Sequence, residues 1–213
     1  IYCFARPSHA FHNLSPGLDF EAKLFVKPDA AKLLAAELSK PGYRCEVMAI
    51  GTNTDPYQPI EREYRVMRSI LKVLWEFKHP VGIVTKSALV TRDIDILAPM
   101  AEQRLAKVAL SITTLDRKLA RAMEPRASTP ERRLDAIRAL SDAGIPTAVM
   151  AAPMIPALND DKSDAFESAK DPPSHEALEQ RTCTADVCCC LRTCRVDTEL
   201  IIDWSNSPER TCA

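Results

Sequence analysis

Short apolar runs, often β-branched, alternate along this chain with longer amphipathic segments from about residue 20 onward. Short runs bounded by polar or turn-forming residues are typical of buried strands. Segments in which apolar residues recur every three or four positions predict helices. We therefore predict strands at residues 23–26, 46–51, 81–85, 106–112 and 147–152, and helices at residues 29–39, 60–77, 92–104 and 115–123.

A further helix is predicted after Ser128, because residues 128–131 (STPE) have the S-x-x-E pattern of a capping box with proline in the first turn. Gly144 is suited to the C-terminal end of that helix. Strands that alternate with helices predict βαβ units and a parallel sheet. No G-x-G-x-x-G follows a strand, which disfavours a dinucleotide-binding sheet. The alternation by itself leaves both a barrel and an open doubly wound sheet as possible architectures.

The periodic pattern stops after about residue 161, so we divide the chain into a core at 1–161 and a tail at 162–213. The tail contains most of the cysteines: Cys183, Cys188, Cys189, Cys190, Cys194 and Cys212. No C-x-x-C pair or histidine at ligand spacing accompanies them, which disfavours a metal site without excluding one. Residues 186–191 (DVCCCL) look like Val-Leu-Leu codons read out of frame. We therefore favour an aberrant tail that adds no strand to the sheet.

Charge and hydropathy disfavour two classes of partner. The formal net charge is −1, so no overall positive field exists to hold nucleic acid non-specifically. No apolar run reaches the roughly 18 residues that predict a membrane span, so we expect a cytoplasmic protein with no membrane partner. The chain opens on Ile1 and not on methionine, and we interpret its N-terminus as truncated.

Polar residues follow the predicted strands at the positions where parallel βα folds collect their functional loops. They are Thr52, Asn53, Thr54 and Asp55 after one strand, Lys86 after the next, and Ser111 and Thr113 at the end of a third. Each residue taken alone is equally well a helix cap, a turn residue or a solvated lysine. Their convergence on one rim predicts a site for an amino-acid-like ligand, which an ammonium, hydroxyls and a carboxylate suit well.

Five motifs along this part of the chain resemble one family. Tyr2–Pro7 (YCFARP) resembles the end of the radical S-adenosylmethionine (SAM) signature C-x-x-x-C-x-Y-C. Residues 51–59, 84–87, 110–113 and 124–130 resemble the subgroup related to spore photoproduct lyase, whose members are often labelled DNA repair photolyase-like. The resemblance runs from residue 1 to about 161. It implies an α/β fold built as a partial (βα)6-type TIM-like barrel of parallel strands, incomplete at both ends.

The resemblance also implies a 4Fe-4S cluster and SAM as cofactors, and an enzyme that generates a 5′-deoxyadenosyl radical to act on an unknown substrate. Three cysteines would hold the cluster, and Cys3 matches one of them. By the same resemblance, Tyr2 packs near the adenine, Thr54 and Asp55 meet the SAM amino group, and Lys86 and Ser111 meet its carboxylate. Thr52, Asn53 and Thr113 belong to the same cofactor-binding loops. The implied partners are an electron donor such as a flavodoxin or a ferredoxin and, by family analogy alone, nucleic acid.

Thr52 departs from the family pattern. In spore photoproduct lyase the aligned position is a hydrogen-donating cysteine, and a threonine hydroxyl does not deliver a hydrogen atom comparably. This argues against thymine-dimer repair and leaves the substrate open. Two alternatives stand beside the radical SAM hypothesis: a βα-barrel Schiff-base lyase with Lys86 as its nucleophile, and a truncated gene product without function.

Overall fold

The computed structural model describes residue 3, residues 5–153, residue 155 and residues 158–159. Its centre is a parallel sheet of β1 (Met48–Ile50), β2 (Val81–Thr85), β3 (Ala106–Ser111) and β4 (Thr147–Met150), in that order. An open doubly wound sheet reverses its strand order at a switch point. Here the order follows the sequence without reversal, as in the wall of a βα barrel. The fold is therefore α/β, a partial TIM-like barrel.

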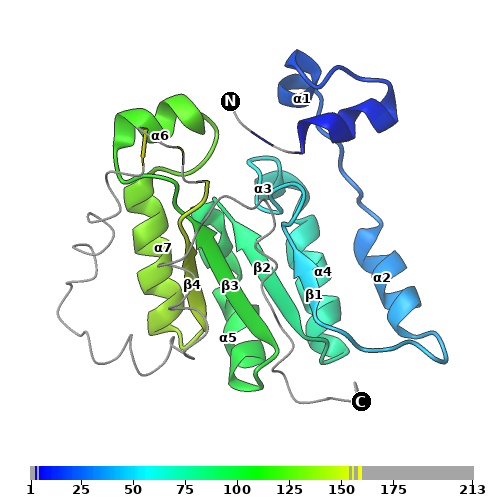
Figure 1. The fold of residues 1–213 in the computed structure, drawn as a ribbon. Coiled ribbons are helices and arrows are strands. Elements are labelled where there is room, and N and C mark those ends of the chain that lie inside the picture. Colours follow the sequence, from blue (N-terminus) through cyan, green and yellow to red (C-terminus); the bar gives the residue numbers. More distant parts are fainter. Residues whose placement is uncertain (1–2, 4, 154, 156–157, 160–213) are drawn as a thin grey trace.

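Helices connect the strands and cover one face of the sheet (Figure 1), where α4, α5 and α7 lie side by side behind it. The described helical segments are η1 (Arg6–His12), α1 (Leu18–Ala22), α2 (Ala30–Leu38), α3 (Glu61–Tyr64), α4 (Val66–Glu76), η2 (Ala88–Asp93), α5 (Ile94–Glu102), α6 (Arg117–Met123) and α7 (Pro130–Asp142). None of them combines the length and apolar character that crossing a membrane requires. Figure 1 also shows α3, α6 and α1 toward the end of the sheet where the strands finish, and α2 beside α4.

The strand predicted at residues 23–26 is wrong. These residues form no strand and pair with none of the described strands. The described neighbour of β1 is β2. Leu24 and Phe25 remain 42% and 54% exposed. The Phe25 ring instead stacks on His12, with centroids 4.2 Å apart. Strand propensity reflects packing against a neighbouring strand, so a short apolar run without such a neighbour stays irregular.

The helix predicted at residues 60–77 is divided into α3 and α4 at Arg65, whose φ of 51° is left-handed. This break lets Glu61 turn back onto the start of α4, where its Oε1 accepts hydrogen bonds from the Met67 and Arg68 amides at 3.1 and 3.4 Å. A carboxylate at this position satisfies amides that have no partner within the helix. Apolar spacing continues through the break, so the pattern by itself did not locate it.

The capping-box pattern predicts Ser128 as the capping residue of α7, but the capping residue is Thr129. The Thr129 hydroxyl accepts from the Arg132 amide at 3.5 Å. The Ser128 hydroxyl accepts from the Ala88 amide at 2.9 Å, which ties the start of α7 to the start of η2. At the other end of the helix Gly144 has a φ of 73°, as predicted for its C-terminal end.

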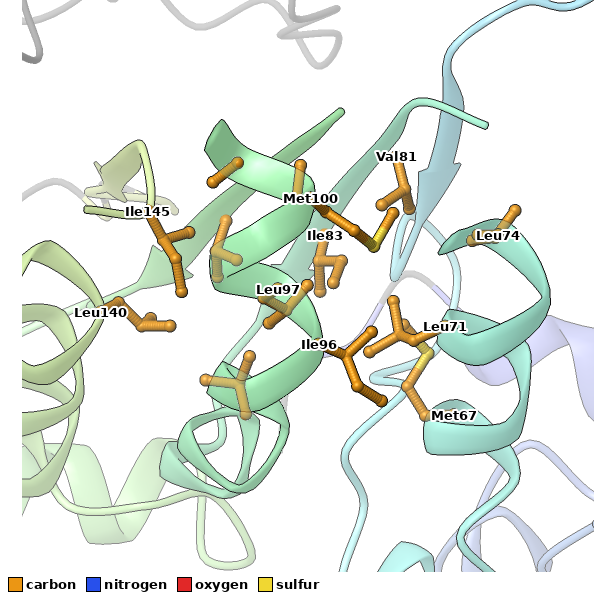
Figure 2. Packing of buried hydrophobic residues seen from close by; sticks show 14 of the residues in the cluster. Met67, Leu71, Leu74, Val81, Ile83, Ile96, Leu97, Met100, Leu140 and Ile145 are labelled. Atoms are coloured by element: carbon orange, nitrogen blue, oxygen red, sulfur yellow. The ribbon is translucent and has the colours of Figure 1, made fainter. Parts of the chain in front are cut away.

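The hydrophobic core lies between the sheet and the covering helices. Figure 2 shows Leu71 and Leu74 of α4 facing Leu97 and Met100 of α5, with Ile83 of β2 beneath them. All five side chains are at most 1% exposed. Burying each one contributes about 1.5–3 kcal/mol relative to leaving it in water. This packing fixes the strands, and so also the loops that follow them.

Candidate functional site

The four parallel strands bring their carboxyl ends to one edge, and the loop after β1 is pressed against β2 at Gly51. Gly51 has a φ of 96°, and a Cβ added there would lie 2.0 Å from the carbonyl oxygen of Val84. Only glycine fits this conformation and this close approach. The polar loop at residues 52–55 therefore starts directly beside the end of β2.

Asp55 joins the β1 loop to the end of β2. Its Oδ1 accepts hydrogen bonds from the Thr85 hydroxyl at 2.7 Å and the Tyr57 amide at 2.8 Å. Its Oδ2 accepts from the amide of Lys86 at 2.6 Å. An ionised carboxylate offers about four acceptor positions, so these three bonds leave one on Oδ2. Asp55 is thus first a brace that orients the backbone of Lys86.

The loop braced by Asp55 is anchored by Tyr57, which is 1% exposed. Burial, followed by the negative charge of Asp93, raises the pKa of the Tyr57 hydroxyl, so this tyrosine stays neutral. Arg92 lies 5.9 Å above the Tyr57 ring and donates to Glu61 Oε1 at 2.9 Å. The same arginine pairs with the fully buried Asp93 at 2.8 Å. This buried charge network fixes the loop that carries Asp55.

Lys86 lies at the centre of the polar cluster. Its Nζ donates to Glu124 Oε1 at 2.7 Å, and the Thr113 hydroxyl donates to the same oxygen at 2.8 Å. The Lys86 side chain is 32% exposed, whereas that of Glu124 is only 6% exposed. The ammonium is therefore the part of this pair that faces outward.

Arg133 of α7 completes the cluster from below. Its Nη2 donates to Glu124 Oε2 at 2.5 Å, its Nη1 to the Ser111 carbonyl at 2.7 Å and its Nε to the Ser128 carbonyl at 2.8 Å. The Arg133 side chain is 2% exposed, so this guanidinium is committed to the protein interior. Glu124 and Arg133 are both buried, and Lys86 is the partly exposed member of these three.

The hydroxyls of Ser111 and Thr113 face β4. The Ser111 hydroxyl donates to the carbonyl oxygen of Ala152 at 3.3 Å. Thr113 Oγ1 lies 3.3 Å from the same oxygen, but its one proton serves the shorter bond to Glu124. The Asn159 side-chain amide donates to the carbonyls of Thr113 at 2.8 Å and Pro153 at 2.9 Å. The segments after β3 and β4 are thereby held together, and the structure brings Asp55, Lys86, Ser111 and Thr113 into one hydrogen-bonded cluster.

Other predicted site residues do not join this cluster. Thr52, Asn53 and Thr54 are exposed in the turn after β1. Tyr2 and the cysteine-rich tail lie outside the described residues. Cys3 is half-buried and is a free thiol. Within the described part of the chain no group of three His, Cys, Asp or Glu side chains is placed to hold a metal. Of the three cysteines that the family resemblance implies for a 4Fe-4S cluster, Cys3 is the one that is described.

Sequence reasoning assigned no role to Glu124 or Arg133. Glu124 stood inside a motif used for the family resemblance, but nothing in its sequence context indicated burial. Arg133 carried a usable signal, because it shares a buried helical face with Pro130, Ala136 and Leu140. A charged residue at such a position is almost never buried without a partner, so it predicts a buried acid nearby.

The ion pair also bears on the Schiff-base alternative. A nucleophilic lysine must be a neutral amine in an apolar or cationic setting. Lys86 instead pairs with a carboxylate, which stabilises the ammonium. The geometry thus favours binding of an anion over attack on a carbonyl.

The chain is thus a βα protein whose parallel strand ends carry an ammonium, hydroxyls and a braced carboxylate. The family model of the Radical SAM superfamily matches residues 1–169, and this chain belongs to that superfamily. Spore photoproduct lyase complexed with dinucleoside spore photoproduct has a similar fold, with a TM-score of 0.51 and 16% identity over 84% of this chain and 56% of that one. A variant of that lyase with bound AdoMet and the same dinucleoside gives a TM-score of 0.53 at the same identity and coverage.

Among curated proteins, the uncharacterized protein Rv2578c of Mycobacterium tuberculosis is 42% identical over 159 residues, which are 75% of this chain and 47% of that protein. An uncharacterized protein of Methanocaldococcus jannaschii is 34% identical over 107 residues, or 50% of this chain and 40% of that one. The chain thus spans about half the length of the curated relatives it matches. The family resemblance seen in the sequence is confirmed.

Proposed function

We propose that this chain forms the SAM-binding part of a radical SAM enzyme, in which Lys86 binds the carboxylate of SAM. One observation carries the proposal: a lysine at the carboxyl end of the sheet whose side chain is 32% exposed and is backed by a buried carboxylate and a buried guanidinium. Charge-assisted hydrogen bonds from an ammonium to a carboxylate are among the stronger contacts that a protein offers. The solved relative that holds AdoMet supports the choice of ligand.

The other residues are assigned around this anchor. We propose that the hydroxyls of Ser111 and Thr113 lie beside the carboxylate, and that Asp55 uses its remaining Oδ2 acceptor position for the SAM amino group. Thr52, Asn53 and Thr54 would form the exposed loop over the amino end. Tyr2 would pack near the adenine.

The superfamily implies a 4Fe-4S cluster, which needs three thiolates and leaves one iron open. Because Cys3 matches the last cysteine of the C-x-x-x-C-x-Y-C signature, we propose that the other two cluster cysteines precede it in the full-length protein. When bound, the cluster and SAM would together supply a 5′-deoxyadenosyl radical, with electrons from a flavodoxin or a ferredoxin. We propose a core at 1–161 and an aberrant tail at 162–213, in a cytoplasmic protein.

The substrate is proposed at the level of class alone. The solved relatives hold a dinucleoside spore photoproduct. By analogy with them alone, we propose nucleic acid as the substrate class of this chain. The exposed Thr52 replaces the hydrogen-donating cysteine, which supports a reaction different from that of the lyase.

The test uses the full-length protein, reconstituted anaerobically with iron and sulfide. With SAM and a reductant it should produce 5′-deoxyadenosine, measured by chromatography. Cys3→Ala should take up no cluster. Failure of the parent protein to take up a cluster would refute the proposed function.

Lys86→Ala should keep the cluster and weaken SAM binding, because one partner of a charge-assisted bond is lost. That loss is about 1.5–3 kcal/mol, a tenfold to hundredfold rise in Kd. Lys72→Ala is the matched control, since Lys72 is exposed on α4, away from the cluster. If Lys86→Ala binds SAM as tightly as the Lys72→Ala control, the assignment of Lys86 is wrong.

A further inference from the structure

Glu124 contacts the ends of two strands, and its side chain is buried. It follows the last residue of α6, and its backbone amide donates to the Ala120 carbonyl at 2.8 Å. Its side chain is 6% exposed, and its two oxygens serve three different parts of the fold: Lys86 after β2, Thr113 after β3, and Arg133 on α7. A carboxylate so enclosed has no free path to a ligand.

From this geometry we infer that Glu124 is a positioning residue, which holds the Lys86 ammonium in place so that it meets the carboxylate of SAM. This inference rests on the proposed function. An ammonium has three donors, and the Glu124 carboxylate accepts one of them at 2.7 Å. A lysine side chain without such a partner would spread over many rotamers, and fixing it on binding would weaken the affinity.

Arg133 is needed for this arrangement to work. A carboxylate next to an anion site repels the ligand as well as orienting the lysine. Arg133, 2.5 Å from the other Glu124 oxygen, offsets the negative charge of Glu124. The guanidinium is itself fixed by the carbonyls of Ser111 and Ser128. The charges of Glu124 and Arg133 therefore offset each other, and Lys86 is the partly exposed member of the three.

The connection between α6 and α7 thereby becomes part of the binding site although it follows no strand directly. Ser128, in the same connection, accepts from the Ala88 amide at the start of η2. The loop at residues 124–128 thus contacts the ends of β2 and β3, the start of η2 and the side chain of Arg133. Changes in this loop should alter recognition of the carboxylate without touching the adenosine end of the ligand.

The experiment measures binding of SAM and of 5′-methylthioadenosine to the full-length, anaerobically reconstituted protein by equilibrium dialysis. Methylthioadenosine keeps the adenosine and the sulfur but lacks the amino and carboxylate groups. The variants are Glu124→Gln, Lys86→Met and the two combined, with Glu131→Gln as the control, because Glu131 is exposed in the first turn of α7. Glu124→Gln should raise the Kd for SAM about tenfold. In the Lys86→Met background the same change should raise it less than about twofold.

Binding of methylthioadenosine should be the same in parent and Glu124→Gln. A merely structural role for Glu124 would instead weaken both ligands equally, or weaken SAM equally with and without Lys86, and either result overturns the inference. The inference is also overturned if Glu124→Gln binds SAM as tightly as the parent while Lys86→Met binds it more weakly. If Lys86→Met has no effect on SAM in the parent, the proposed function fails at its anchor, which is a distinguishable outcome.

Glu124→Gln leaves the buried Arg133 without its acid and could therefore unfold the protein. The second variant for this test is Glu124→Asp. Glu124→Asp keeps the charge beside Arg133 but withdraws the carboxylate by one methylene from Lys86. It should fold and still weaken SAM severalfold with no change for methylthioadenosine. Parent-like binding of SAM by a folded Glu124→Asp protein would equally overturn the positioning role.

Discussion

Replacing Gly51 by alanine should destabilise the protein more than the same change at Gly42 or Gly144. Two effects add at this position. Its φ of 96° is unfavourable for a residue with a Cβ, which costs about 1–2 kcal/mol. The new Cβ would also lie 2.0 Å from the Val84 carbonyl oxygen, although real Cβ atoms essentially never come within 3.0 Å of another atom.

The clash cannot be relieved by a side-chain rotation, because the atom it meets belongs to the backbone of β2. The β1 loop must move away by about an ångström or the local bond angles must bend, which adds roughly 2–3 kcal/mol. We therefore expect a total loss of about 3–5 kcal/mol in the free energy of unfolding. The displaced loop carries Asp55, so SAM binding in the full-length protein should weaken too.

Gly42 provides the matched control, since its φ of 87° is similar but nothing lies within 4 Å of a Cβ built there. Gly42→Ala should lose about 1–2 kcal/mol, the backbone effect alone. Both variants are measured by urea denaturation followed by circular dichroism. Equal losses for Gly42→Ala and Gly51→Ala would refute the argument that the contact between β1 and β2 requires a glycine.

Two further predictions concern groups beside the core. Asp93→Ala should lose about 3 kcal/mol because it leaves two arginines without the buried acid they share, whereas removing the exposed Asp135 should lose less than about 0.5 kcal/mol; similar losses in urea denaturation would contradict this. Burial lowers the pKa of His79 below its usual 6.5, and its Nε2 accepts from the Tyr43 hydroxyl at 2.7 Å while Nδ1 donates to the Pro80 carbonyl. Well above pH 6.5, His79 is neutral in both the folded and the unfolded chain. As the pH falls below about 6.5, the unfolded chain takes up a proton first, so the free energy of unfolding decreases until the pH reaches the folded pKa. His79→Gln should flatten this slope in the pH range below about 6.5, and an unchanged slope would rule His79 out.

The sequence by itself determined the parallel strands, the connecting helices and the polar strand ends. The physical reason is that apolar periodicity records burial, and burial in a βα unit is mostly decided between neighbours in the chain. The strands at 46–51, 81–85, 106–112 and 147–152 are therefore confirmed with small changes at their ends. The run at 23–26 failed because a strand also needs a partner, and no local pattern reports one.

The polar cluster divides in the same way. Lys86, Ser111 and Thr113 were predictable because parallel strands bring their carboxyl ends to one edge. Glu124 and Arg133 were not, because their pairing joins a loop after α6 to the middle of a buried helical face on α7. Which carboxylate meets which guanidinium is decided by the packing of α7 against the sheet. That contact is absent from any pattern along the chain, so only the tertiary structure could supply it.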